Sequence, residues 1–265
     1  MKKNRSRILR LLSYNRGVIV RNIKLTIEYD GKDYNGWQKQ PDKLNIQGNI
    51  EKAIETITGE QIDLMASGRT DRGVHALGQV ANFKTESKLP IQKFPIAINT
   101  YLKQSIRIIS AEEVEEKFHS RLSCKKKTYR YVINNSKYGT AIYRNLETHI
   151  PVKLDVKKMK EAVKYFEGEH DFKAFKASGT SSKSSVRTIY KAEVKELSDE
   201  RICIELTGNG FLYNMVRIIS GTLVDVGLGK IEPKDIGNII KSEKRENAGK
   251  TLPPQGLYLL NVEYE

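Results

Sequence analysis

Residues 186–207, VRTIYKAEVKELSDERICIELT, decide the fold class because they place two strand-like segments next to each other in the sequence. We expect strands at Val186–Leu197, where apolar and polar residues alternate from Tyr190 to Val194, and at Arg201–Thr207, where Ile202, Ile204 and Leu206 are spaced by two. The intervening Ser198-Asp199-Glu200 is rich in turn-forming residues. Two adjacent strands joined by a short turn pair antiparallel, which disfavours a purely parallel βαβ sheet. The segment therefore predicts an α+β fold.

The rest of the second half supplies further strands and helices around this pair. Apolar residues alternate in Thr128–Ile133 and in Leu257–Tyr264, which predicts two strands. Asp155 is a suitable N-cap for a helix that ends at Gly168. Two more helices are expected, from Phe211 to Val226 and after Pro233.

The first half shows the same order of elements. Ile23, Leu25, Ile27 and Tyr29 alternate with polar residues and predict a strand. Isoleucines from Ile46 to Ile57 recur at helical spacing, and Gly59 stands where a C-terminal cap belongs. The remaining expected elements are strands at Gln61–Met65, Gln79–Phe83 and Arg107–Ser110, and a helix at Ile91–Tyr101.

These two similar halves predict duplicated split-βαβ units. We expect two ferredoxin-like halves, residues 21–110 and 111–265, each with an antiparallel sheet flanked by helices, and a cleft between them. Residues 1–20 form a basic N-terminal extension that we expect to be disordered or absent from the natural product.

The net charge of +14 favours a polyanionic partner. Residues 1–21 hold seven Lys or Arg and no acid, and leaving them out gives 39 basic against 32 acidic residues, a net charge of +7. Charge alone leaves RNA, DNA and an acidic membrane surface as alternatives. Ile218–Val224, the longest uncharged stretch of the C-terminal half, is too short to span a membrane.

Cofactor and metal motifs are incomplete in this sequence. Cys124 and Cys203 lie 79 residues apart, which suggests neither a zinc site nor a disulfide and fits a reducing cytoplasm. Gly208-Asn209-Gly210 lacks the third glycine of a dinucleotide fingerprint, and the polar loop Ser178–Ser185 lacks the glycine that precedes a Walker A lysine. We expect no cofactor, no metal and a cytoplasmic location.

Residues 66–76, ASGRTDRGVHA, contain the strongest candidate for a functional group. Asp71 lies between Arg69 and Arg72, and glycines bracket all three. One interpretation is a surface turn in which Asp71 caps its own backbone. The other is a carboxylate that a neighbouring arginine keeps ionised, in a loop whose glycines permit close approach of a ligand.

A resemblance to a known family favours the second interpretation. Residues 68–83 resemble the signature of the TruA family of tRNA pseudouridine synthases, with GRTDRGVHA followed by GQVANF. Further matches follow in order, namely YDG at 29–31 with YNGWQKQ at 34–40, FHSR at 118–121, KTYRY at 127–131, HDF at 170–172, VRTI at 186–189, GNGFLYNMVR at 208–217 and PQGLYL at 254–259. Ser120 replaces the family's usual alanine, and residues 102–106 lack the usual proline and acid.

The resemblance implies that Asp71 is the catalytic aspartate of a reaction that detaches uracil from the ribose and rejoins it through C5. Asp71 would attack C1′, attack C6 or remove a proton from C2′. Arg69 would orient Asp71 and fill the space that the flipped nucleotide leaves. Tyr129 would stack on the uracil, although it also fits a strand core aromatic. Arg217 would pair with Asp71 or steady the cleft, and Leu257 would line the uracil pocket.

The resemblance also implies RNA contacts and partners. The remaining substrate-binding candidates are Arg72, His75, Lys127, Arg130 and Arg187, with Lys127 part of the basic run 125–127, although a charge run is often only a solvated face. Family members act as homodimers on uridines at tRNA positions 38 to 40. The rival interpretations are a non-catalytic RNA-binding protein of the same fold, and a glycosidase or nucleoside hydrolase, which usually needs a second carboxylate or a metal.

Overall fold

The computed structural model describes residues 19–179, 184–197 and 200–265. The predictions made for the N-terminal extension 1–20, the polar loop 178–185 and the turn 198–200 therefore lie wholly or partly outside the described residues.

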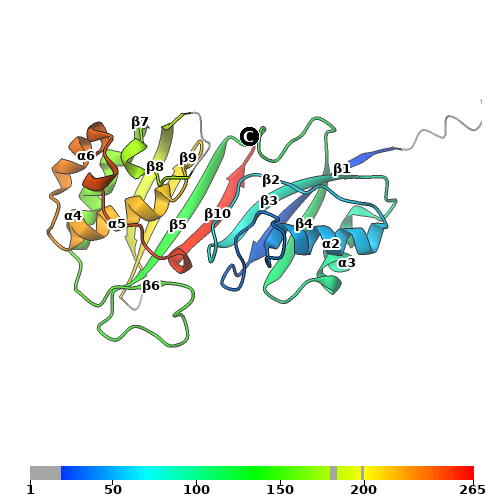
Figure 1. The fold of residues 1–265 in the computed structure, drawn as a ribbon, viewed down its shortest axis with the longest axis horizontal. Helices are drawn as coiled ribbons and strands as arrows, with labels where there is room; N and C mark the ends of the chain where they lie inside the picture. Colours follow the sequence, from blue (N-terminus) through cyan, green and yellow to red (C-terminus); the bar gives the residue numbers. More distant parts are fainter. Residues whose placement is uncertain (1–18, 180–183, 198–199) are drawn as a thin grey trace, which may run out of the picture.

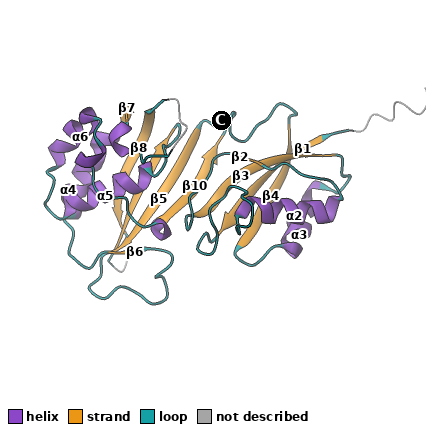
Figure 2. Ribbon diagram, in the orientation of Figure 1, coloured by secondary structure: helices purple, strands orange, loops and turns teal. Residues whose placement is uncertain are grey.

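One mixed sheet runs through both halves of the chain (Figures 1 and 2). Its main path has the order β4-β1-β3-β10-β5-β9-β8-β7, with β2 beside β3 and β6 beside β5. All pairs are antiparallel except β3 with β10 and β5 with β6. The α+β prediction is confirmed, but a single continuous sheet replaces the two separate sheets that we expected. The strands are β1 (Arg21–Tyr29), β2 (Met65–Ala66), β3 (His75–Thr85), β4 (Ile106–Val114), β5 (Lys126–Asn134), β6 (Thr148–His149), β7 (Gly168–Asp171), β8 (Val186–Glu196), β9 (Arg201–Gly208) and β10 (Leu257–Glu263).

The helices begin and end largely where capping residues predict. Helix α2 ends at Gly59, which has a left-handed φ of 74°, and the Asp155 side chain accepts from the Lys158 N–H at the start of α4. The helix expected from Phe211 begins later, after Asn214, whose φ of 60° is left-handed. The α-helices are α2 (Ile46–Thr58), α3 (Phe94–Tyr101), α4 (Val156–Ala162), α5 (Met215–Gly227) and α6 (Ile236–Ser242), and the 3₁₀ turns are η1 (Ile91–Lys93), η2 (Val163–Phe166), η3 (Lys173–Phe175), η4 (Pro233–Asp235), η5 (Arg245–Asn247) and η6 (Pro254–Gly256).

Strand register assigns side chains to the two faces of the sheet. Directly paired residues share a face, so a row that crosses β1, β3, β10, β5, β9 and β8 can be followed from partner to partner. Every member of this row is buried, and its members are Tyr29, Ala76, Leu259, Tyr129, Leu206 and Ala192. Figure 1 shows α2 and α3 at one end of the sheet and α4, α5 and α6 at the other, with β5 and β10 between the two groups.

The two halves meet at a short parallel pairing between β3 and β10. Only two residue pairs form it, His75 with Tyr258 and Ala76 with Leu259. The buried His75 ring stacks on Tyr258 with centroids 4.9 Å apart, and its Nδ1 accepts from the Gly31 N–H at 3.1 Å. Burial lowers the pKa of His75, against the opposing effect of the Asp30 carboxylate. The His75 ring is thus enclosed at the junction, and its expected contact with substrate stays a prediction.

This junction predicts a pH dependence of stability. The folded chain keeps His75 neutral below the ordinary pKa of 6.5, whereas the unfolded chain takes up a proton there. The contribution of His75 to the free energy of unfolding is complete above that pH and is lost as the pH falls toward the lower folded pKa. Denaturant unfolding of the parent and of His75→Gln at pH 7.5 and 5.5 measures this, and the variant should lose less stability on acidification. An equal loss in both proteins would contradict the assignment.

Candidate functional site

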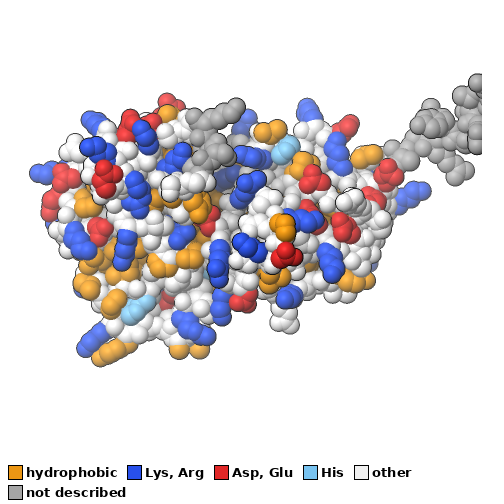
Figure 3. All heavy atoms as spheres, viewed as in Figure 1, with side chains coloured by type: hydrophobic (Ala, Val, Ile, Leu, Met, Phe, Trp, Pro, Cys, Tyr) orange, Lys and Arg blue, Asp and Glu red, His pale blue; other side chains and the backbone are white. Residues whose placement is uncertain are grey.

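The site lies on the helix-bearing face of the sheet, between the two groups of helices. We define the central strip as the residues of β5 and β10 that point to this face, namely Lys127, Tyr129, Tyr131, Leu257 and Leu259. The loop that carries Asp71 borders the strip on one side, and the start of α5 borders it on the other. Figure 3 shows Lys and Arg side chains gathered across the middle of this view, between the helical ends.

Backbone contacts with the segment after β1 fix the Asp71 loop. The Trp37 N–H donates to the Thr70 carbonyl at 3.1 Å, and the Thr70 hydroxyl bonds the buried Tyr29 hydroxyl at 2.7 Å. Gly36 has a left-handed φ of 87°, and a Cβ there would lie 2.7 Å from the Thr70 carbonyl oxygen. Only glycine permits this approach, so the loop and the segment hold each other in one arrangement.

Asp71 is partly buried and has a cationic neighbour from the other half of the chain. Its side chain is 29% exposed, and its Oδ2 lies 3.7 Å from Nη1 of Arg217. Burial raises the pKa of Asp71, while the Arg217 guanidinium lowers it. The result is a carboxylate that is less stabilised than one in water, which is a property of catalytic acids and bases.

Arg217 is held in place at the start of α5. Its Nε donates to the Leu252 carbonyl and its Nη1 to Asn214 Oδ1, both at 2.7 Å. Asn214, which accepts this hydrogen bond, has a left-handed φ and lies just before the helix begins. Asp71 and Arg217 thus come from different halves of the sequence and meet beside the central strip.

The two arginines next to Asp71 in sequence do not share this arrangement. Arg69 and Arg72 are both exposed, and neither forms a hydrogen bond or ion pair with another of the described residues. The pairing expected of Arg217 with Asp71 is present, whereas the orienting role expected of Arg69 has no contact to support it. Both guanidinium groups project from the loop and can contact a ligand.

Tyr129 lies in the floor of the strip, close to Asp71. It is 8% exposed, and its ring meets Phe211 edge to face with centroids 5.1 Å apart. Burial raises the pKa of Tyr129, and the nearby Tyr29 and Asp71 raise it further, so the phenol is neutral near pH 7. Leu257 is also buried and pairs with Tyr131, whose hydroxyl bonds Thr148 and the Pro253 carbonyl. Phe211, which we expected to begin a helix, is the aromatic partner that sequence reasoning missed.

The three basic residues assigned to RNA phosphates fall in different places. Lys127 donates to the Ser67 carbonyl at 2.6 Å, and this hydrogen bond supports the loop that carries Asp71. Burial lowers the pKa of Lys127. Arg130 points to the opposite face of the sheet, where its Nε and Nη2 lie 2.8 and 2.6 Å from Glu205 Oε1. Lys127 and Arg130 thus lie on opposite faces of β5, since side chains alternate between the two sides of a strand. Contact of each with a phosphate stays a prediction.

Arg187 is the third of these residues and lies near the loop that leads to α5. It is partly buried beside Gly210, its Nη1 donates to the Ser184 and Val186 carbonyls, and burial lowers its pKa. It therefore stays a candidate for contact with a polyanion, on the α5 side of the strip.

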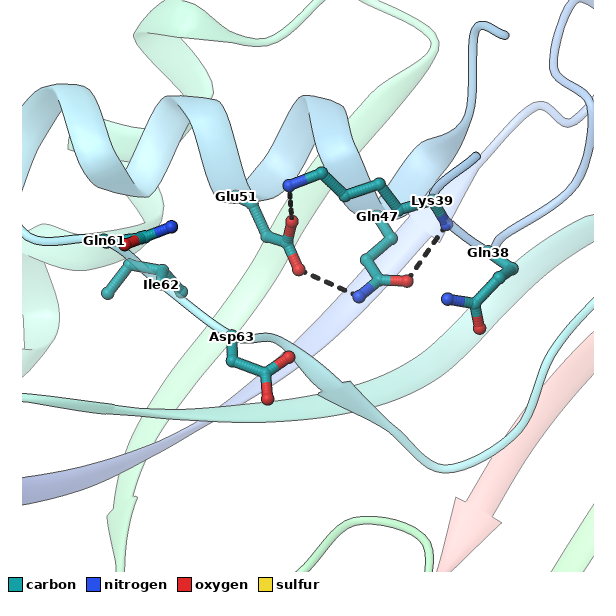
Figure 4. Close-up of a pocket in the computed structure, with 7 residues that line it drawn as sticks. All are labelled: Gln38, Lys39, Gln47, Glu51, Gln61, Ile62 and Asp63. Carbon is teal, nitrogen blue, oxygen red and sulfur yellow. Dashed lines mark hydrogen bonds and ion pairs between the residues drawn. The ribbon is translucent and has the colours of Figure 1, made fainter. Parts of the chain in front are cut away.

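A hollow beside α2 has a structural role (Figure 4). It encloses about 550 Å³ and is lined by Gln38, Lys39, Gln47, Glu51, Gln61, Ile62 and Asp63. Figure 4 shows the Glu51 carboxylate between Lys39 and Gln47, at 2.9 and 2.8 Å, and the Leu64 N–H also donates to it. Both oxygens of this carboxylate accept hydrogen bonds, so the carboxylate joins α2 to the segment that holds the Asp71 loop.

The described residues contain no group of side chains suited to a metal ion and no helix suited to crossing a membrane. No three His, Cys, Asp or Glu side chains in this part of the chain are grouped so that they could hold a metal ion. Across the same ranges, each helix is too short or too polar to cross a bilayer.

Comparisons with known proteins give close relatives. A family model described as tRNA pseudouridine synthase matches residues 25–122 and 162–265. The chain is 54% identical over 245 residues to tRNA pseudouridine synthase A of Caldicellulosiruptor saccharolyticus, and 51% identical to that of Acetivibrio thermocellus, covering 92% of this chain and all of each relative. Among solved structures, a Cbf5-Nop10-Gar1 complex matches with 13% identity and a TM-score of 0.32, covering 88% of this chain and 56% of that chain.

The pairing of Asp71 with Arg217 predicts a specific change in ionisation. Arg217→Gln should raise the pKa of the Asp71 carboxyl, because burial then acts without the opposing guanidinium. Carboxyl-carbon NMR of aspartate-labelled protein measures this pKa. Arg69→Gln is the matched control and should leave the pKa unchanged. A rise in Arg69→Gln that equals the rise in Arg217→Gln would contradict the assignment of the partner.

Proposed function

The chain belongs to the family of tRNA pseudouridine synthases, and from this premise we propose that it isomerises uridine to pseudouridine in tRNA with Asp71 as the catalytic carboxylate. The observation that carries the proposal is the contact of 3.7 Å between Asp71 and Arg217, beside Tyr129 and among basic side chains. This combination supplies an ionised oxygen, an aromatic surface and a field that attracts RNA.

The reaction needs a carboxylate at a place where positive charge develops. Cleavage of the bond between uracil N1 and ribose C1′ leaves the sugar electron-poor and the uracil negatively charged. Three routes use an ionised Asp71, namely addition to C1′, addition to uracil C6 and removal of the C2′ proton. In each route the bond between N1 and C1′ breaks, uracil turns and C5 bonds to C1′. The C5 proton leaves to water, N1 takes up a proton and Asp71 is regenerated, so substrate and product have the same composition.

Arg217 and burial act together on Asp71. The guanidinium favours the ionised form, and partial burial keeps the carboxylate from being fully solvated. Arg217 thus opposes the effect of burial on the pKa of Asp71 and favours the ionised form that each route uses. Arg217 is therefore a positioning residue in this proposal.

The remaining residues around the strip divide into base and backbone contacts. Uracil lies against Tyr129 and Leu257, while the exposed Arg69 enters the space that the everted nucleotide leaves. Arg72 and Arg187 contact phosphates on the two sides of the strip.

Finer aspects of the proposal come from the family. We propose uridines 38 to 40 of the anticodon stem-loop as targets, a homodimer as the active form, and the cytoplasm as the location. We also propose that residues 21–110 and 111–265 are two ferredoxin-like halves. The order of strands and helices on either side of the β3–β10 junction supports this division.

Replacement of Asp71 tests the reaction directly. Asp71→Asn keeps the shape of the side chain and removes its charge, so release of tritium from 5-tritiated uridine in tRNA should fall by roughly 10²- to 10⁴-fold. Affinity for tRNA, measured by filter binding, should be retained. Asp33→Asn, which changes an exposed acid in the neighbouring segment, should release tritium like the parent. Equal release by parent and Asp71→Asn would show that the chain does not use this carboxylate, and binding without release by the parent would favour a non-catalytic RNA-binding protein.

The role of Tyr129 predicts a difference between two substitutions. Tyr129→Phe preserves the ring and should change turnover little, since the phenol is neutral and only the ring contacts the base. Tyr129→Leu removes the aromatic face and should lower kcat/KM by about fivefold or more, the effect of losing about 1 kcal/mol of base stacking. Steady-state tritium release measures both. If Tyr129→Phe fell as far as Tyr129→Leu, the hydroxyl rather than the ring would be the functional group.

A further inference from the structure

A projecting loop between β5 and β6 carries features that the proposed chemistry does not use. We define the tyrosine loop as residues 136–146, which lie between the end of β5 and the start of β6. Its Tyr138 is 85% exposed, Ile142 78% and Tyr143 47%. Large apolar side chains are normally withdrawn from water, so three on one short segment indicate a contact surface.

Hydrogen bonds within the loop give it a defined shape. The Ser136 N–H and hydroxyl both donate to Asn134 Oδ1, and the Gly139 N–H donates to the Ser136 hydroxyl. The Thr140 hydroxyl oxygen accepts from the Ile142 N–H, and the Leu146 N–H donates to the Tyr143 carbonyl. The exposed rings are thus presented by a preformed turn, which lowers the entropy cost of binding.

Cations lie on the faces of both tyrosine rings. Lys137 Nζ is 5.1 Å from the Tyr138 centroid, and the Arg201 guanidinium carbon is 4.7 Å from that of Tyr143. The tyrosine loop also contains Arg144 and no acidic residue. Figure 3 shows hydrophobic and basic side chains together along the lower edge of the molecule. Arg201 also pairs with Glu147 at 2.7 Å, so Lys137 and Arg144 are the cations of this surface that we assign to phosphates. Aromatic rings beside cations suit single-stranded nucleic acid.

The loop is attached to the strands that form the central strip. The Tyr258 hydroxyl, next to Leu257 in sequence, donates to the Leu146 carbonyl at 2.5 Å. The Tyr131 hydroxyl bonds Thr148, immediately beyond the loop, at 2.6 Å. Figure 1 shows the segment between β5 and β6 extending beyond the sheet from the point where β5 ends.

We propose that the tyrosine loop is a second RNA contact, which takes unpaired nucleotides of the bound tRNA outside the central strip. The face of Tyr138 stacks with a base, and Lys137 and Arg144 pair with phosphates of the same segment. This inference rests on the proposed function for the identity of the RNA.

A protein partner fits the loop less well. A specific protein interface buries about 800 Å² on each side. One aromatic side chain buries about 150–250 Å², so two tyrosines and an isoleucine fall short of that area. The absence of acidic residues from the loop agrees better with a polyanion than with a neutral or basic protein surface.

Equilibrium binding of an unmodified tRNA transcript tests the proposal. Tyr138→Ala should weaken binding about fivefold or more at constant salt, and Tyr138→Trp should restore it, because the indole also stacks. Lys137→Gln should reduce the magnitude of the slope of log K against log salt concentration by about 1, the contribution of one phosphate contact. The matched control is Tyr101→Ala, an exposed tyrosine at the end of α3, which should bind like the parent.

Two results would overturn the proposal. One is that Tyr138→Ala binds tRNA with the affinity of the parent. The other is that this unaltered affinity is accompanied by a changed sedimentation coefficient, which would make the loop an interface between protein copies. Tritium release by the parent separates this test from that of the reaction. A parent that binds tRNA without release refutes the reaction alone, whereas normal release with unweakened Tyr138→Ala refutes the loop contact alone.

Discussion

The short parallel pairing of β3 with β10 is the constraint on which the rest of the structure depends. It joins residues near 75 to residues near 258 and so turns two groups of strands into one sheet. Because the register of a strand fixes which face each side chain occupies, these two residue pairs align the helix-bearing faces of both halves. A slip of one residue at this point would put Leu259 on the wrong face and separate Asp71 from Tyr129. The stacking of His75 on Tyr258 reinforces the register of this ladder of two residue pairs.

The chemistry follows from what this alignment brings together. Asp71 stands on a loop whose backbone is packed against another backbone, and Arg217 stands at the start of a helix from the other half. The two groups come from different halves of the chain, so Arg217 acts on the Asp71 carboxylate only when both halves are assembled. Partial burial raises the pKa of the Asp71 carboxyl and the Arg217 guanidinium lowers it, beside the buried ring of Tyr129.

Local patterns in the sequence predicted the elements well, and long-range pairing limited the rest. Alternation at 186–207 and the cap at Asp155 identified strands and a helix, because both depend on residues a few positions apart. Lys127 and Arg130 were both expected to contact RNA, but they lie on opposite faces of β5 and have different partners. Motif membership could not tell a buried ring from an exposed one, so His75 was assigned to substrate. The single sheet could not be foreseen, since its β3–β10 pair joins segments more than 180 residues apart.

The central claim is that the reacting nucleotide meets Asp71 on the helix-bearing face of the sheet. A structure of the Asp71→Asn protein with uridine-containing tRNA tests this most directly, because the variant should bind without turning over. The account predicts ribose C1′ of the target in van der Waals contact with residue 71 and the uracil ring against Tyr129. A target uridine held on the opposite face, beside Arg130 and Glu205, would contradict it.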